Sequence, residues 1–176
     1  AAAARASGLQ SVPHLPCCRF GSSEDAAVVL DALCGGAADG GTADLLMHGG
    51  SPSNGFASVA AAMEAGVLRP VDDVCGGTSW RRGRLRRVLL RGHPQRDGEA
   101  TSNAELVYKA EHLLSTGYAV GVLSAPCLSA RALVEWVRTT RHHMNAQRLR
   151  HTGANPVVFH IGVDVPNEWA RGARAD

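Results

Sequence analysis

The chain has 176 residues, enough for one domain that buries its own hydrophobic core. Hydrophobic residues make up 45% of it and charged residues 19%, a composition that argues against intrinsic disorder, and no stretch approaches the roughly 20 apolar residues of a membrane-spanning helix. The five cysteines form no CxxC pair and stand at no zinc-finger spacing, so we expect reduced thiols, an intracellular location and no metal.

The first 20 residues are expected to be a presequence remnant or a linker, followed by a single globular domain over residues 21–176. The opening "AAAARASGLQSVPHLP" lacks acidic residues and carries alanine, serine and arginine, which is typical of a mitochondrial or plastid presequence. An arbitrary start of the sequence is the alternative interpretation.

The next segments predict a helix, a strand and a second helix. Ser22 stands three residues before Asp25, in the spacing of a capping box, and the helix that follows is expected to end at Gly35. After a glycine-rich loop, "LLMH" at 45–48 predicts a short strand. A second helix is expected after Ser53 or Asn54, and its end is expected at residue 66, a glycine.

A basic insertion is predicted at about 71–98, because this segment mixes glycines and arginines and has one apolar triplet. We expect one strand in it, at 87–90. One interpretation of its arginines is contact with phosphate, in RNA or in a dinucleotide. The alternatives are a solvated loop and a docking site for an acidic protein neighbour. The arginines are Arg81, Arg82, Arg84, Arg86, Arg87 and Arg91.

The last part of the chain predicts two helices and two strands. Ser102 and Glu105 have capping-box spacing, and the helix they open is expected to end at Gly117. "YAVGVLS" then predicts a buried strand, "SARALVEWVRTTRHHMNAQRL" an amphipathic helix and "VVFHIGVDV" a final strand. The order predicts an α+β protein with a small mixed sheet and flanking helices, although the connections leave the direction of each strand open.

His48 is the first candidate site residue. It lies at the carboxyl end of a predicted strand, and the glycines after it let a ligand approach the backbone closely. Ligands favour such positions, and the pattern suits a nucleotide. The alternative is that His48 only caps a turn.

Three segments resemble the ADP-ribosyltransferase superfamily, and especially the RNA 2′-phosphotransferases. "LLMHGGSPSNGFASVAAAMEAGVLRP" is similar to the family's opening strand, polar loop and helix; "VGVLSAPCLSARALVEWV" and "RHTGANPVVFHIGVDV" are similar to its later segments. The resemblance implies an ADP-ribosyltransferase-like core with a basic insertion, and an NAD-dependent ADP-ribosyl or RNA 2′-phosphate transferase. It implies catalytic roles for His48 and Arg150, and contact with NAD by His48, Gly49, Gly50, Ser51, Arg150 and His151.

The chain also departs from the pattern of this family. Val122 and Leu123 stand where the family has a histidine or a tyrosine, and Gly50 replaces a threonine. A degenerate domain is therefore a second hypothesis: a non-catalytic accessory subunit of a large organellar protein or ribonucleoprotein complex, with RNA or acidic proteins as neighbours of the arginine-rich segment.

Overall fold

The computed structural model describes residues 12–35, 44–49, 54–68, 85, 87–94, 100–127, 129–147 and 157–162. Five parallel strands form one sheet in the order β1-β2-β3-β4-β5. The inner strands are apolar runs buried on both faces, as is usual for parallel sheets. The strands are β1 (His14–Pro16), β2 (Asp44–His48), β3 (Arg87–Gly92), β4 (Ala119–Ser124) and β5 (Val158–His160).

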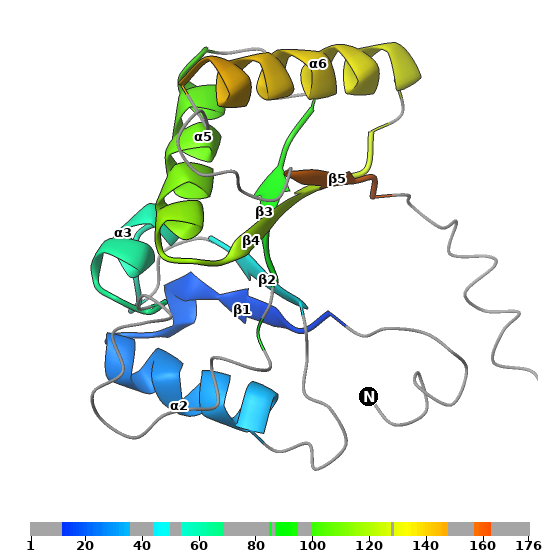
Figure 1. The fold of residues 1–176 in the computed structure, drawn as a ribbon. Coiled ribbons are helices and arrows are strands. Elements are labelled where there is room, and N and C mark those ends of the chain that lie inside the picture. The colour runs from blue at the N-terminus through cyan, green and yellow to red at the C-terminus, as the bar shows by residue number, and fades with distance from the viewer. Residues whose placement is uncertain are drawn as a thin grey trace, which may run out of the picture.

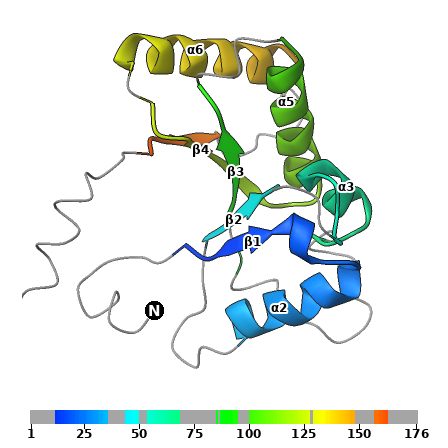
Figure 2. The same cartoon turned by 180° about the vertical axis from the view of Figure 1, so that it is seen from behind.

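The described helices lie on one side of this sheet, with α2 next to β1, α3 and α5 beside the middle strands and α6 next to β5 (Figures 1 and 2). Successive parallel strands joined by right-handed crossovers place their helices in this way. The helices are α2 (Ser23–Gly35), α3 (Val59–Glu64), α5 (Ala100–Ser115) and α6 (Ala130–Gln147), and a short 3-10 helix, η1 (Cys17–Arg19), follows β1. None of the described helices is long and apolar enough to cross a membrane.

The core lies between the sheet and the helices. Alternate strand residues such as Met47, Leu90 and Val122 belong to one buried cluster with Leu30 of α2 and Leu113 of α5. Because side chains alternate along a strand, the residues between them point to the other side of the sheet. We call that side the opposite face. No described helix covers it.

The predicted sheet with flanking helices is confirmed. The strand direction, which the sequence left open, is parallel in every described pair, and no antiparallel pair occurs among the described strands. Positive φ angles of 81° at Gly66 and 89° at Gly117 confirm two predicted helix ends. The backbone N–H of Asp25 donates to Ser22 Oγ at 3.1 Å, which confirms the first cap.

Two other predicted caps were wrong. The N-cap of α3 is Ser58, whose hydroxyl accepts from the Ala61 N–H at 3.0 Å, and not Ser53 or Asn54. The helix α5 begins at Ala100, so Ser102 lies inside the helix and not at its N-cap position. Several serines and asparagines compete in these segments, and local sequence does not decide which one adopts the extended backbone of a cap.

Two predicted boundaries also need correction. Residues 14–20 belong to the domain, because β1 is an edge strand of the sheet and Leu15 is fully buried in the core. A three-residue strand that follows Pro13 and ends at Pro16 shows no alternation, so the sequence pattern missed it. The segment predicted as an insertion at 71–98 contains β3, the middle strand, whose Val88, Leu89 and Leu90 are buried. The strand predicted at 87–90 is thus confirmed and continues to Gly92.

Candidate functional site

The carboxyl ends of β2 and β3 lie side by side. Met47 pairs with Leu90 in the sheet register, so His48 at the end of β2 comes next to Arg91 near the end of β3. His93 follows immediately after β3. In parallel α/β sheets, ligands bind outside the carboxyl ends of the strands, where the loops and helix starts leave room.

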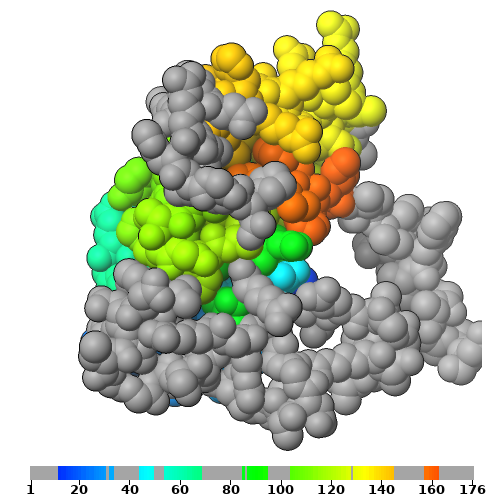
Figure 3. Space-filling model, in the orientation of Figure 1, coloured from blue at the N-terminus to red at the C-terminus, as the bar shows by residue number. Residues whose placement is uncertain are grey.

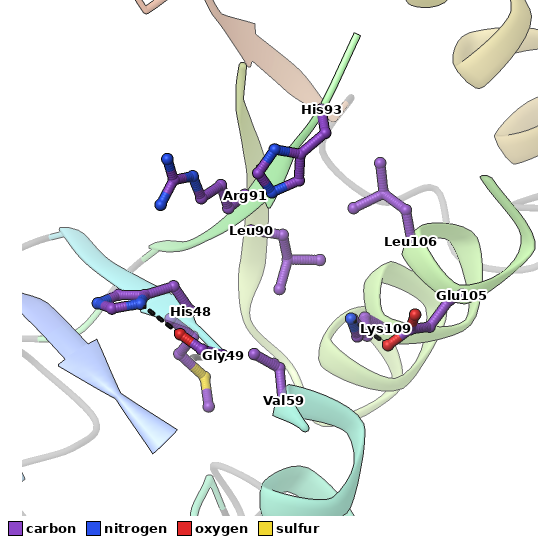
Figure 4. Close-up of a pocket in the computed structure, with 10 residues that line it drawn as sticks. His48, Gly49, Val59, Leu90, Arg91, His93, Glu105, Leu106 and Lys109 are labelled. Atoms are coloured by element: carbon purple, nitrogen blue, oxygen red, sulfur yellow. Dashed lines mark hydrogen bonds and ion pairs between the residues drawn. The ribbon is translucent and has the colours of Figure 1, made fainter. Parts of the chain in front are cut away.

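A cavity of about 360 Å³ opens at this edge, between the ends of β2 and β3, the start of α3 and the first half of α5 (Figure 4). This volume is within the range of about 300–1,000 Å³ typical of small-molecule sites, near its lower end. The apolar lining residues are Met47, Val59, Leu90 and Leu106; the others are His48, Gly49, Arg91, His93, Glu105 and Lys109.

The ring of His48 is held by its own backbone and by a second histidine. Nδ1 lies 2.7 Å from the Gly49 carbonyl oxygen, and a carbonyl accepts hydrogen bonds only, so this geometry assigns the proton to Nδ1. Nε2 is then the acceptor of the neutral ring. The ring of His14, on β1, meets the His48 ring edge to face, with 5.7 Å between the ring centroids. The half-buried imidazole is therefore oriented, and Nε2 is available to a ligand hydroxyl.

The wall formed by α5 carries an ion pair between Lys109 and Glu105, one helical turn apart. The Lys109 side chain is only 17% exposed, whereas the Glu105 side chain is 52% exposed. Figure 4 shows this pair across Leu90 from His48 and Arg91.

Glu105 is the one carboxylate among the described residues that line the cavity. The lining also includes two cationic side chains, those of Arg91 and Lys109, and the imidazoles of His48 and His93. The site therefore has more cationic side chains than carboxylates, and it suits a ligand with phosphate or carboxylate oxygens.

Of the residues predicted to contact NAD, the structure brings His48 and Gly49 to the cavity. Gly50, Ser51, Arg150 and His151 lie outside the described residues, so their predicted roles stay predictions. Arg91, whose predicted contact with nucleic acid or a protein partner stays a prediction, also lines this cavity.

Of the other predicted contact arginines of the basic segment, the structure describes Arg87 alone. Arg87 lies at the start of β3, away from the cavity, and its guanidinium is 3.7 Å from the Asp44 carboxylate. The remaining four, Arg81, Arg82, Arg84 and Arg86, lie outside the described residues.

Sequence reasoning missed three residues that line the cavity. His93 follows β3 in the motif "GHP", a signal comparable to the "HGG" after β2, and it was available in the sequence. Glu105 was interpreted only as part of a helix cap. Lys109, the single lysine of the chain, stands four residues after Glu105, but this spacing predicts an ion pair on any helix and does not point to a cavity.

The described part of the chain also contains three free cysteines, Cys17, Cys18 and Cys127. Burial raises the pKa of the Cys17 thiol to about 11, and the neighbouring Cys18 adds to this effect, so Cys17 stays protonated at neutral pH. The described residues contain no group of three or more histidine, cysteine, aspartate or glutamate side chains that could hold a metal ion.

No known protein family matches this chain, and no curated protein shows significant similarity to it. The functional assignment therefore depends on the geometry of the site.

Proposed function

We propose that the cavity at the carboxyl ends of β2 and β3 binds a nucleotide through its phosphate, with NAD as the ligand that the sequence resemblance suggests. One observation carries the proposal: the parallel pairing of β2 and β3 brings His48 and Arg91 to the same edge of a single cavity. A nucleotide needs both a cation for its phosphate and an apolar surface for its base, and this cavity offers both.

The lining residues suggest how such a ligand would bind. The guanidinium of Arg91 can donate two parallel hydrogen bonds to a phosphate, and His48 Nε2 can accept from a ribose hydroxyl. The apolar surface of Leu90 and Leu106 then faces the base. A volume of about 360 Å³ suits a mononucleotide, so the second half of a dinucleotide would extend beyond the cavity.

Transfer from NAD is the reaction that we propose for this site. It requires a pocket that holds the nicotinamide ribose while positive charge develops on it, together with cations that hold the pyrophosphate. His48 is the candidate for holding the ribose. Arg91 helps to hold the pyrophosphate, with Arg150 as the further cation that the resemblance suggests.

Calorimetric titration of the full chain with AMP and with NAD tests the proposal. We expect both ligands to bind, and His48→Ala to weaken NAD binding at least tenfold, equivalent to about 1.4 kcal/mol. Arg91→Gln should weaken both ligands at least tenfold, because a charge-assisted hydrogen bond is lost. The matched control is Arg138→Gln, which removes an exposed arginine of α6 outside this cavity.

Two results would contradict the proposal. If the wild-type chain binds neither AMP nor NAD, the nucleotide site is refuted and the non-catalytic subunit becomes the better hypothesis. If the chain binds NAD but releases no nicotinamide, alone or with 2′-phosphorylated RNA, the transferase reaction is refuted and nucleotide binding stands.

For the arginine-rich segment we propose contact with RNA or with an acidic protein neighbour in an organellar complex. If RNA is the partner, the logarithm of the affinity should fall linearly with the logarithm of the salt concentration, by about 0.7 for each phosphate neutralised on a single strand. Replacing Arg81, Arg82 and Arg84 together by glutamine should flatten this slope. An unchanged slope, or no binding to RNA, would favour the acidic protein neighbour.

A further inference from the structure

The wall of the nucleotide cavity that α5 forms carries a hydrogen-bond donor and an acceptor side by side. The Lys109 ammonium and the Glu105 carboxylate form an ion pair within one helical turn, and both residues line the cavity. An ammonium has three N–H donors and a carboxylate has about four lone-pair positions, so one ion pair leaves donors on Lys109 and acceptors on Glu105 unused. The pair can therefore bind a neutral ligand group that has its own acceptor beside its own donor.

The two side chains of the pair differ in exposure. The Lys109 side chain is 17% exposed and the Glu105 side chain 52%. Figure 3 shows atoms of α5 at the molecular surface, in agreement with the exposed glutamate. A charged group that has lost much of its contact with water needs several hydrogen-bond partners, and the structure shows one, Glu105, for Lys109 among the described residues. A ligand acceptor in the cavity would give this ammonium a second partner.

The order of the groups across the cavity matches the order of the groups in a nucleotide. Figure 4 shows His48 and Arg91 on one side, Leu90 in the middle and the ion pair on the far side. The proposed function places the phosphate at Arg91 and the ribose at His48. The base then lies against Leu90, and its outer edge meets Glu105 and Lys109.

We infer that Glu105 and Lys109 are specificity-determining residues that recognise the carboxamide of a nicotinamide nucleotide. The inference rests on the proposed function, in which His48 holds the nicotinamide ribose. A carboxamide has an NH₂ donor beside a carbonyl acceptor, so the NH₂ group donates to Glu105 and the carbonyl oxygen accepts from Lys109. Glu105 also disfavours nicotinic acid nucleotides, because their carboxylate is ionised at neutral pH, has no N–H to donate and carries the same charge as Glu105.

Calorimetry on the full chain compares nicotinamide mononucleotide with nicotinic acid mononucleotide, which differ only in the group that meets the ion pair. We expect the wild-type chain to bind nicotinamide mononucleotide at least about tenfold more tightly, because the acid loses a charge-assisted hydrogen bond and gains a repulsion. This preference is the ratio of two dissociation constants measured on the same protein. A variant with a smaller folded fraction therefore still reports it correctly.

Substitutions of the two residues should change the preference in opposite directions. Glu105→Gln removes the repelling charge and frees Lys109 to pair with the acid, so the preference should fall below about twofold or reverse. Lys109→Met keeps the apolar stem and leaves the Glu105 charge unpaired. It should weaken nicotinamide mononucleotide at least about fivefold and raise the preference above that of the wild type. The matched control is Glu111→Gln, on the same helix but not among the residues that line the cavity, and it should keep the wild-type preference.

The remaining outcomes distinguish this inference from the proposed function. An unchanged preference in both Glu105→Gln and Lys109→Met would overturn the inference, because the ion pair would then only stabilise α5. Equal affinity of the wild-type chain for the two mononucleotides would also overturn it, while the binding of nucleotides in the cavity would stand. If the wild-type chain binds neither AMP nor NAD, the proposed function fails and this inference fails with it.

Discussion

Replacing Gly92 by alanine is expected to destabilise the protein through one defined contact. A Cβ atom at this position would lie 2.3 Å from Cζ2 and 2.6 Å from Cη2 of Trp136. Carbon atoms that are not bonded pack at about 3.5–4.0 Å, so the indole ring would have to shift by more than an ångström. The glycine at the end of β3 thus leaves the space that the tryptophan of α6 fills.

The ring of Trp136 has little freedom to move. It is 95% buried, with a 5% exposed fraction, and it packs edge to face on Phe159 of β5 with 5.8 Å between the ring centroids. Phe159 has a second contact: the guanidinium carbon of Arg141 lies 5.2 Å from the centre of its ring. A shift of the indole would therefore disturb the packing of α6 on the last strand.

The size of the destabilisation by Gly92→Ala follows from the cost of adding a methyl group to a filled core. An extra methyl group in a filled core costs about 1–3 kcal/mol, and the smaller entropy of the unfolded chain with alanine returns about 0.4–1 kcal/mol. We expect a net loss of about 1–2 kcal/mol in the free energy of unfolding. For a chain of this size, that lowers the melting temperature by about 2–8 °C.

Urea denaturation at 25 °C, followed by circular dichroism, measures the effect. Gly49→Ala is the matched control, because a Cβ atom on Gly49 has no other atom within 4 Å. The free energy of unfolding of this variant should stay within about 0.5 kcal/mol of the wild type. Equal stability of the Gly92→Ala and Gly49→Ala variants would refute the reasoning. If the clash with the indole is the cause, Gly92→Ala should cost measurably less in a Trp136→Leu background.

The remaining predictions concern a cap, a helix end and a thiol. Ser58→Ala should lower the free energy of unfolding by about 1 kcal/mol, because the Ala61 N–H loses its acceptor, and urea denaturation measures the loss. Gly117→Ala should cost about 1–2 kcal/mol in the same assay, because alanine is strained at φ 89°. Iodoacetamide at pH 8 should alkylate Cys127 before Cys17, whose buried thiol has a pKa of about 11; equal rates by mass spectrometry would contradict this. In the folded state Cys17 stays protonated above pH 9, whereas the thiol of the unfolded chain loses its proton there. The free energy of unfolding should therefore fall as the pH rises from about 9 to about 11. It should fall less over this range in a Cys17→Ala variant.

The sequence by itself determined the features that depend on neighbouring residues. Glycine after an amphipathic run predicted the ends of α3 and α5, because few other residues adopt a positive φ there. The spacing of apolar residues predicted the buried side of α6, on which Trp136, Thr140 and Met144 are indeed buried. The position of His48 at the end of a strand followed from the apolar run before it.

Only the tertiary structure decided which of these elements meet. Local periodicity specifies whether a segment is a helix or a strand, but the direction and partner of each strand depend on packing between segments far apart in the chain. For that reason the sequence did not predict that Arg91 lies next to His48, or that Lys109 lies across the cavity from both. The edge strand β1 was missed for a related reason: its three residues carry no pattern of their own, and its pairing with β2 and the burial of Leu15 hold it in the sheet.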